Sequence, residues 1–429
     1  MVSKDVDEAT MIRELSTRLV AAQDSIHILD SIKWDDSIKR RFFECNAQYL
    51  PKVDRDYYQN RPLPFDVKEK QEEFRLIIRD AQNHLGQYSP VTRLIKRQCE
   101  EYSLAVQMLE ARGTPTFCEL SMELYGSPND AFYLGGPRLS DLGTLLFDVL
   151  TALDVQLQSD ADIKRYSAEE AQQLLQKRLS TFFTAHNDRI TVTVSDDMVA
   201  DASAGADTIK LSQKTRFSER DLRYLEVHEG WVHVGTTLNG ELQPCFFLSK
   251  GSPSCSVIQE GLAVITEIVT FSSYPARVRK ITNRVIALEK VRLGANFIDI
   301  YRYFLQCGLT ADESYNHTVR VFRGSTPEGG PFTKDLAYAK GFLLVYNYLR
   351  FAISQHRVDS IPLLFAGKVV LDDLPLLNEL KERGLLVAPR YMPTPFQDFA
   401  ALSAWMSFSL FLNQFSLTEM QKNFRFLLV

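Results

Sequence analysis

The stretch "LEVHEGWVH", residues 225–233, is the feature that most restricts how this 429-residue chain can fold. It places Glu229 directly after His228, and a second histidine, His233, five positions after the first. Residues on a regular α-helix advance about 100° each, so positions i and i+5 point about 140° apart. A π-type turn, with i→i+5 hydrogen bonds, would bring both imidazoles to one face, and such turns often occur at functional sites. Gly230 lies within this turn and would ease the distortion.

The sequence around this stretch predicts the helix that carries it. Ser218 in "SERD" is a favourable N-cap, and Asp221 stands three residues later, at the spacing of a capping box. Asn239 and Gly240 suit a left-handed C-cap. The predicted helix therefore spans about 219–239. Two independent histidines on an amphipathic helix remain an alternative to a shared metal site, because short motifs often match by chance.

Two short alternating segments precede this helix. Apolar and polar residues alternate in "DRITVTVSDD" (188–197) and again in "TIKLSQ" (208–213), which is typical of half-buried strands. The intervening "DASAGAD" (201–207) has the composition of a turn. We therefore expect a hairpin or a pair of neighbouring strands. The edge of such a pair can bind an extended peptide by strand addition.

The "QEGLA" segment, which begins at Gln259, supplies a third candidate metal ligand. Ser256 can cap a helix here, with Gln259 reaching back to it, so a helix is predicted over about 257–271. Its first turn contains Glu260. Zinc in catalytic sites takes three protein ligands and keeps one position open, and this carboxylate would complete the set with the two histidines. The helix dipole alone also favours a glutamate in a first turn, so both interpretations stay open.

Two features nearby have alternative interpretations. Glu267 lies two turns after Glu260 and can either orient a ligand histidine or face solvent. The segment "PARVRKITNR" (275–284) collects four basic residues. It can attract an acidic peptide, but a solvated helix face is the favoured interpretation.

A third helix start lies in "PFTKD". Thr333 can cap a long helix that continues through Tyr338 to about Leu349. Lys334 and Tyr338 are four residues apart, so they would share one face of this helix.

The chain as a whole is predicted to be an α+β protein that is predominantly helical. Its length exceeds the roughly 250–300 residues at which a single hydrophobic core usually stops growing. Residues 1–125 are mostly helical in pattern, and we treat them as an N-terminal region that precedes a second region, 126–429. The formal net charge of −5 argues against a general nucleic-acid-binding protein, in which a basic excess is typical.

The sequence also favours a cytoplasmic protein that does not cross a membrane. The first ten residues, "MVSKDVDEAT", contain no apolar run typical of a secretory signal. The longest apolar run, "FAALSAWMSFSLFLNQF" (399–415), is shorter than the ~20 residues that span a bilayer, so it is predicted to be a buried core helix. Six scattered cysteines without C-x-x-C pairs indicate reduced thiols, which are usual in the cytoplasm.

Several motifs in one order resemble a known family. These are "HEGWVH" and "QEGLA", followed by "VFRG" (321–324) and "GGPFTKDLAYAKGF" (329–342). They are similar to those of the QEGLA-motif proteins, named in bacteria as flavohaemoglobin expression-modulating proteins. The eukaryotic relatives of these proteins are the microtubule-associated tyrosine carboxypeptidases. The resemblance covers roughly 185–350 and is looser on either side.

The resemblance implies a zincin-like metallopeptidase core within residues 126–429. His228, His233 and Glu260 would hold Zn²⁺, and Glu229 would be the general base. These roles agree with general chemistry, because zinc lowers the pKa of a water molecule toward 7 and an adjacent carboxylate can take its proton. The carboxylate can later pass that proton to the leaving amine.

The resemblance also implies how a substrate would bind. A carboxypeptidase must hold the terminal carboxylate of a peptide or protein, and a guanidinium can do so with its planar fork. Arg320, Arg323 and Lys334 are the candidates, and the resemblance favours the last two. Tyr338 is a candidate donor to the oxyanion of the transition state.

The expected activity is removal of a C-terminal residue, tyrosine or another aromatic, with no nucleic-acid or membrane partner. The alternatives are another zinc hydrolase, such as an aminopeptidase, and a regulatory binding protein in which metal is structural or absent. The sequence gives no indication of the oligomeric state.

Overall fold

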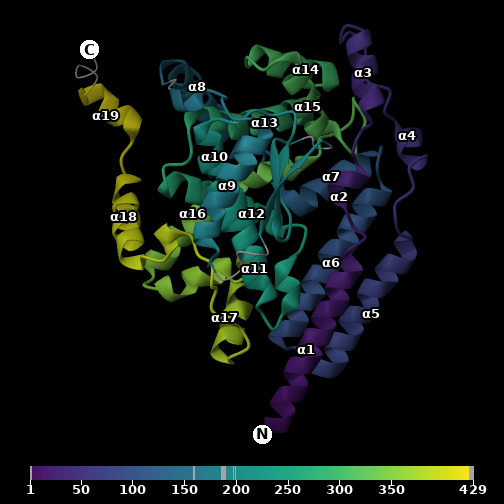
Figure 1. Ribbon diagram of the computed structural model, residues 1–429, viewed down its shortest axis with the longest axis vertical. Helices are drawn as coiled ribbons and strands as arrows, with labels where there is room; N and C mark the ends of the chain where they lie inside the picture. The colour runs from purple at the N-terminus through teal and green to yellow at the C-terminus, as the bar shows by residue number, and fades with distance from the viewer. Residues whose placement is uncertain (1, 158–159, 185–189, 197, 199, 425–429) are drawn as a thin grey trace.

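The computed structural model describes residues 2–157, 160–184, 190–196, 198 and 200–424. These residues are predominantly helical with one small sheet, which confirms the predicted α+β class (Figure 1). The α-helices are α1 (Val2–Gln23), α2 (Ile28–Ser31), α3 (Asp36–Glu44), α4 (Arg55–Gln59), α5 (Val67–Leu85), α6 (Pro90–Glu110), α7 (Pro115–Tyr125), α8 (Leu139–Gln156), α9 (Ala168–Phe182), α10 (Glu219–Leu225), α11 (Gly235–Glu241), α12 (Cys255–Val269), α13 (Pro275–Arg292), α14 (Phe297–Gln306), α15 (Ala311–Phe322), α16 (Ala337–Ser354), α17 (Leu374–Glu382), α18 (Phe399–Leu412) and α19 (Leu417–Phe424). A π-helix, η3 (Glu226–Val234), joins α10 to α11, and the 3₁₀ turns are η1 (Asp160–Asp162), η4 (Phe246–Ser249), η5 (Thr333–Leu336), η6 (Val358–Phe365), η7 (Leu371–Asp373) and η8 (Thr394–Phe396).

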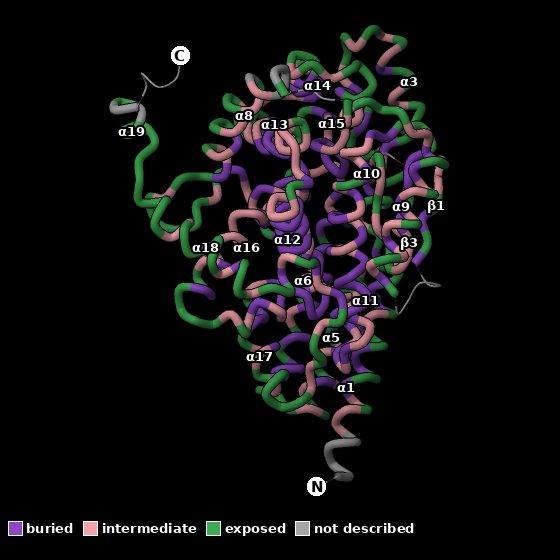
Figure 2. Tube along the Cα trace, turned by 60° about the vertical axis from the view of Figure 1, so that its left-hand side comes forward, coloured by how far each residue is buried: buried purple, intermediate pink, exposed green. Residues whose placement is uncertain are grey.

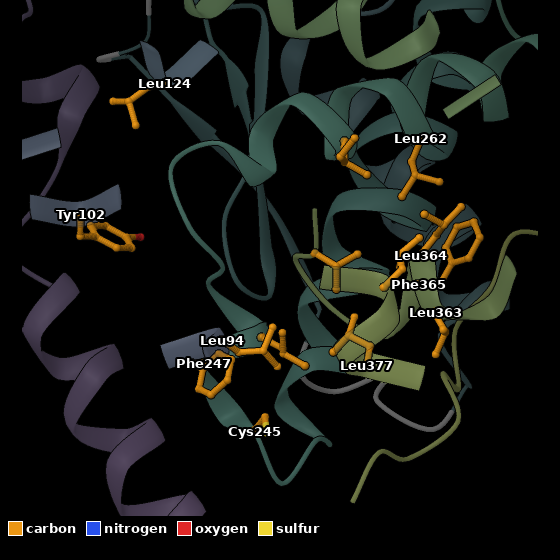
Figure 3. Packing of buried hydrophobic residues seen from close by; sticks show 14 of the residues in the cluster. Leu94, Tyr102, Leu124, Cys245, Phe247, Leu262, Leu363, Leu364, Phe365 and Leu377 are labelled. Carbon is orange, nitrogen blue, oxygen red and sulfur yellow. The ribbon is translucent and has the colours of Figure 1, made fainter. Parts of the chain in front are cut away.

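The N-terminal helices share a hydrophobic core with the rest of the chain. Helices α1, α5 and α6 pack side by side along one flank of the molecule (Figure 1). Figure 3 shows Leu94 and Tyr102 of α6 in the same buried cluster as Phe247, Leu262 and Phe365. The predicted helical character of residues 1–125 is confirmed for its described part, and α7 ends at the predicted boundary. A domain division at that boundary stays a prediction.

The three strands form a sheet in the order β1-β3-β2. Strand β1 (Thr191–Ser195) pairs in parallel with β3 (Thr208–Ser212), while β2 (Ala202–Ala204) pairs antiparallel with β3. The first and last strands are therefore neighbours, as one alternative predicted, but they are not a hairpin. The reason is that the segment predicted as a turn contains β2, which folds back onto β3 and reverses the chain once more.

Helix α12 lies at the centre of the molecule and is largely buried (Figure 2). Its closest neighbour is α16, and the two backbones meet at a pair of glycines. A Cβ atom on Gly261 would lie 2.2 Å from the backbone of Gly341, and a Cβ on Gly341 would lie 1.9 Å from the carbonyl oxygen of Val257. Only glycine permits this approach, which brings the start of α16 beside Glu260.

We expect Gly341→Ala to destabilise the protein strongly, because its methyl group would meet backbone atoms that cannot turn aside. Overpacking typically costs about 1–3 kcal/mol, and a rigid backbone contact belongs at or above the top of that range. Gly235→Ala is the control, since its nearest neighbour would be an ordinary 3.6 Å contact. Urea unfolding of both variants measures the difference. Equal stabilities would contradict the role of this helix contact.

The apolar segment 399–415 is not the buried core helix that its composition predicts. Only Leu402 and Met406 of α18 are buried, whereas Phe408 and Phe411 are 71% and 60% exposed. The helix lies on the side of the molecule and touches the body mainly through α16 (Figure 2). A composition rule misses this because burial depends on what packs against the helix. In the part of the chain that the structure describes, no helix is long and apolar enough to span a bilayer.

Candidate active site

The two histidines share one face because the helix is widened where they lie. Helix α10 begins with the predicted capping box, in which Ser218 and Asp221 bond to each other's backbone amides at 3.1 and 2.6 Å. The π-helix η3 follows and contains both histidines. The ring centroids of His228 and His233 are 4.8 Å apart. The predicted widened turn is therefore confirmed.

The end of this helix differs from the prediction. Asn239 and Gly240 do not form a left-handed cap, because both lie within α11 and are buried. The Asn239 amide nitrogen donates to the carbonyl oxygens of Phe365 and Tyr391 at 2.8 and 2.7 Å. A Cβ on Gly240 would lie 2.5 Å from the carbonyl oxygen of Leu248. Asn239 and Gly240 therefore occur here because they contact residues outside their own helix, and a local capping pattern does not contain such contacts.

Glu260 brings a carboxylate to the two imidazoles. Its Oε2 lies 3.1 Å from Nε2 of His228 and 3.6 Å from Nε2 of His233. One ligand atom from each residue falls within 4.8 Å of the others. A tetrahedral zinc ion with bonds of about 2.0–2.1 Å separates its ligand atoms by roughly 3.3 Å. The donor types, and the 3.1 and 3.6 Å between the carboxylate oxygen and the two imidazoles, fit a zinc ion.

The helix that carries Glu260 begins differently from its prediction. It starts at Cys255, and its N-cap residue, Ser254, makes no side-chain capping bond. The hydroxyl of Ser256 instead donates to the carbonyl oxygen of Pro253. Glu260 is therefore in the second turn of α12 and not in the first. The helix dipole falls off within the first turn, so it does not explain this glutamate.

The other nitrogen of His228 is held by a buried carboxylate. Nδ1 lies 2.7 Å from Oε1 of Glu267, which is fully buried and also accepts from Nη2 of Arg277 at 3.1 Å. This confirms the contact predicted as one alternative for Glu267. A carboxylate on Nδ1 fixes the tautomer that leaves Nε2 free to bind a metal.

Hydrogen bonds between the imidazoles and the carboxylates change the pKa values of His228 and Glu260. Burial alone would lower the pKa of His228, but in the metal-free protein the hydrogen bonds that its ring donates to Glu260 and Glu267 raise that pKa to about 9. Burial would raise the pKa of Glu260, but the two imidazoles hold it well below its usual value. Glu260 is therefore ionised and suited to a cation.

A cleft of about 670 Å³ reaches the cluster at His228, and Glu229 and Tyr338 also line it, whereas His233 and Glu260 do not. Glu229 comes from the same π-helix as His228 and lines the cleft beside it. The ring of Tyr338 stacks on the His228 ring at 6.1 Å, and the Arg284 guanidinium lies 4.8 Å from its centroid. Burial raises the pKa of Tyr338 to about 12, so its hydroxyl keeps its proton and can donate.

The three predicted carboxylate-binding residues occupy different environments. Arg320 lines the cleft but already donates to both oxygens of Asp335, each at 2.8 Å. Arg323 and Lys334 do not line the cleft; the buried Arg323 lies against Phe332, and the half-buried Lys334 lies against Tyr125. Lys334 is on the 3₁₀ turn η5, because α16 begins only at Ala337 and ends at Ser354. The predicted long helix that contains Tyr338 is therefore confirmed, but its first turn, which carries Lys334, is a 3₁₀ turn, and it extends beyond Leu349 to Ser354.

A sequence model of the microtubule-associated tyrosine carboxypeptidases matches residues 40–414. The chain belongs to this family. The predicted resemblance is thus confirmed, and the match covers far more of the chain than the motifs that first indicated it. Membership of a carboxypeptidase family supports a peptidase activity. No curated protein matches the chain.

In this tyrosine carboxypeptidase family member, the basic segment 275–284 lies on α13, where Lys280 is exposed, as the favoured solvated helix face predicts, and Arg284 is buried. Arg277, Lys280 and Arg284 of α13 line the cleft. Their spacing, three and then four residues, places them on one side of a helix and is the signal that could have identified them. Sequence reasoning also missed Lys368, whose ammonium lies 2.7 Å from the carbonyl oxygen of His233.

Proposed function

We propose that this protein is a zinc carboxypeptidase that removes a C-terminal residue, tyrosine or another aromatic, from a peptide or protein. The observation that carries the proposal is the close cluster of His228, His233 and Glu260 at a cleft that also contains Glu229. Family membership supports the reaction class. The preference for tyrosine follows from the family description alone.

His228, His233 and Glu260 would hold the zinc ion. When bound, zinc supplies Lewis-acid polarisation and lowers the pKa of water toward 7. The Glu267–Arg277 pair keeps the His228 ring in one orientation and one tautomer.

Glu229 would move the proton. Its carboxylate faces the cleft beside His228, so it can accept a proton from the water that attacks the scissile carbonyl. The same carboxyl group can then pass that proton to the leaving amine. Tyr338 faces the same space with a neutral hydroxyl, and no described residue forms a hydrogen bond with it. This hydroxyl can donate to the oxyanion that forms as the water adds.

Arg323 and Lys334 are suited to the terminal carboxylate, because neither cation forms an ion pair with a carboxylate among the described residues. The Nε of Arg323 is buried without a hydrogen-bond partner, and none of the described residues forms a hydrogen bond or ion pair with Lys334. Burial lowers the pKa of both groups, to about 10 for Arg323. Burying a cation without a partner is costly, and a bound carboxylate would offset that cost. The negative charge of Glu260 opposes this lowering of the Lys334 pKa.

An extended substrate can also pair with the sheet. Glutamines 172 and 176 of α9 bond to the backbone of β1 at Val192 and Ile190, so that edge is occupied. In the part of the chain that the structure describes, β2 has β3 as its only strand partner. Ala202, the first residue of β2, lines the cleft. The β2 edge is therefore the favoured position for strand addition.

The experiment that tests the function compares a peptide with a free C-terminal carboxylate and its C-terminal amide. Wild-type protein with zinc should cleave the free acid and leave the amide intact. Arg323→Ala should lower kcat/KM for the free acid by roughly 10–100-fold, because it removes a hydrogen bond between charged groups. Arg292→Ala, which removes a surface arginine paired with Glu289, should have no effect.

Mass spectrometry of the peptide products measures these rates and identifies the residue that is released. Equal cleavage of the acid and the amide would contradict a carboxypeptidase and favour another zinc hydrolase. Release of an aliphatic residue in preference to tyrosine would contradict the proposed side-chain preference only.

A further inference from the structure

Side-chain donors from two parts of the chain, α11 and the segment before η7, gather at the C-terminal end of the π-helix. The hydroxyl of Thr236 lies 2.7 Å from the carbonyl oxygen of Val232. The hydroxyl of Thr237 donates to the carbonyl oxygen of His233 at 2.9 Å. The ammonium of Lys368 donates to the same His233 carbonyl at 2.7 Å. These bonds form where the widened helix returns to a regular α-helix.

Gln259 connects this helix end to α12. Its side-chain oxygen lies 2.7 Å from the Thr236 hydroxyl and 3.0 Å from the Lys368 ammonium. Both Gln259 and Thr236 are buried, so water does not replace these contacts. Gln259 directly precedes Glu260, and Lys368 bonds to the backbone of His233. The side-chain amide of Gln259 therefore links α12, which carries Glu260, to the end of the π-helix, which carries His233.

Lys368 is held in place by rigid backbone packing. Its amide donates to the carbonyl oxygen of Leu248 at 2.7 Å. That oxygen lies between two glycines, because a Cβ on either Gly240 or Gly367 would approach it within 2.5–2.6 Å. The backbone of Lys368 therefore has little freedom to move relative to α11. Its ammonium acts from a fixed position.

We propose that Lys368 and Gln259 are positioning residues that clamp the end of the π-helix to α12, so that His233 stays within ligand distance of Glu260. The inference rests on the proposed function, because it gives the cluster its role as a metal site. A π-helix has an intrinsically less favourable geometry than an α-helix and needs tertiary support. The clamp supplies that support at His233, whose imidazole must stay close to Glu260. Neither residue lines the cleft.

The test uses the full chain with Lys368→Met, which keeps the side-chain length and removes the ammonium. Lys340→Met is the matched control, since Lys340 pairs with Asp130. In metal-free protein, hydrogen exchange of amides in residues 226–241 should be faster in Lys368→Met than in wild type or the control. Co²⁺ should bind roughly 10–100-fold more weakly, as is typical when a residue that orients a ligand is lost. Its visible absorption spectrum should also change.

A second pair of variants keeps the inference testable if Lys368→Met does not fold. Thr236→Val removes the hydroxyl and preserves the shape, whereas Thr236→Ser keeps the hydroxyl. Valine should reproduce the faster exchange and weaker Co²⁺ binding, and serine should restore both.

Each outcome has a distinct meaning. Unchanged exchange in Lys368→Met and Thr236→Val would overturn the clamp. Faster exchange with unchanged Co²⁺ affinity and spectrum would overturn the positioning role, because the contact would then be structural only. If wild-type protein binds neither Co²⁺ nor Zn²⁺, the proposed function fails, and hydrogen exchange alone decides whether the clamp holds the helix.

Discussion

Glu229→Gln should lower kcat/KM by roughly 10²–10⁴-fold, the usual loss when a general base is removed. Glutamine keeps the size of the side chain but cannot accept the proton. Glu229 lines the cleft beside His228 and is not one of the three clustered ligands, so zinc should remain bound. The measurement is turnover of a free-acid peptide, combined with metal analysis of the same samples.

The control for this variant comes from the same π-helix. Glu226→Gln removes a carboxylate that lies 3.8 Å from Arg178 and does not line the cleft, so activity should change little. Full activity in Glu229→Gln would refute the general-base role. Loss of zinc together with activity would instead identify Glu229 as a ligand.

The second prediction with a large expected effect is that substitution of a cluster residue removes the zinc ion. Wild-type protein should contain about one zinc per chain, because three donors of the preferred types are grouped at ligand distances. His228→Ala and Glu260→Ala should each remove the zinc and abolish turnover, because two remaining donors do not hold a catalytic zinc. His84→Ala, which removes an exposed histidine at the end of α5, should retain both.

Metal analysis after dialysis against a weak chelator distinguishes the outcomes. Full zinc retention in both cluster variants would place the metal elsewhere and exclude these residues as ligands. Zinc loss in the variants with no turnover by wild type would favour the regulatory alternative, in which the metal is structural.

The local parts of the site were predictable from the sequence. The five-residue spacing of His228 and His233 required a widened turn if the two share a face, and the structure has a π-helix there. The capping box at Ser218 fixed where the helix begins. The alternating residues around 190 and 210 indicated strands. Each of these signals depends on neighbours within about one helical turn or one strand, so the sequence contains it directly.

Predictions failed where packing overrides a local pattern. Asn239 and Gly240 have the composition of a helix end, yet they make tertiary contacts within a continuing helix. Ser256 and Gln259 have capping-box spacing, yet Gln259 bonds to Thr236 and Lys368 instead. In each case a residue type has two uses, and the local sequence does not say which one the fold employs.

The sequence by itself determined the motifs, their order and the family, and it offered the widened turn as one of two alternatives. Tertiary structure alone decided that Glu260 faces both histidines and that Arg277 reaches the carboxylate behind His228. It also placed Lys368 under the carbonyl of His233, 135 positions earlier in the chain. These contacts depend on how closely α12 can approach its neighbours, which the glycines at 261 and 341 permit. Backbone periodicity acts over a few residues, whereas such distances are set by the packing of segments far apart in sequence.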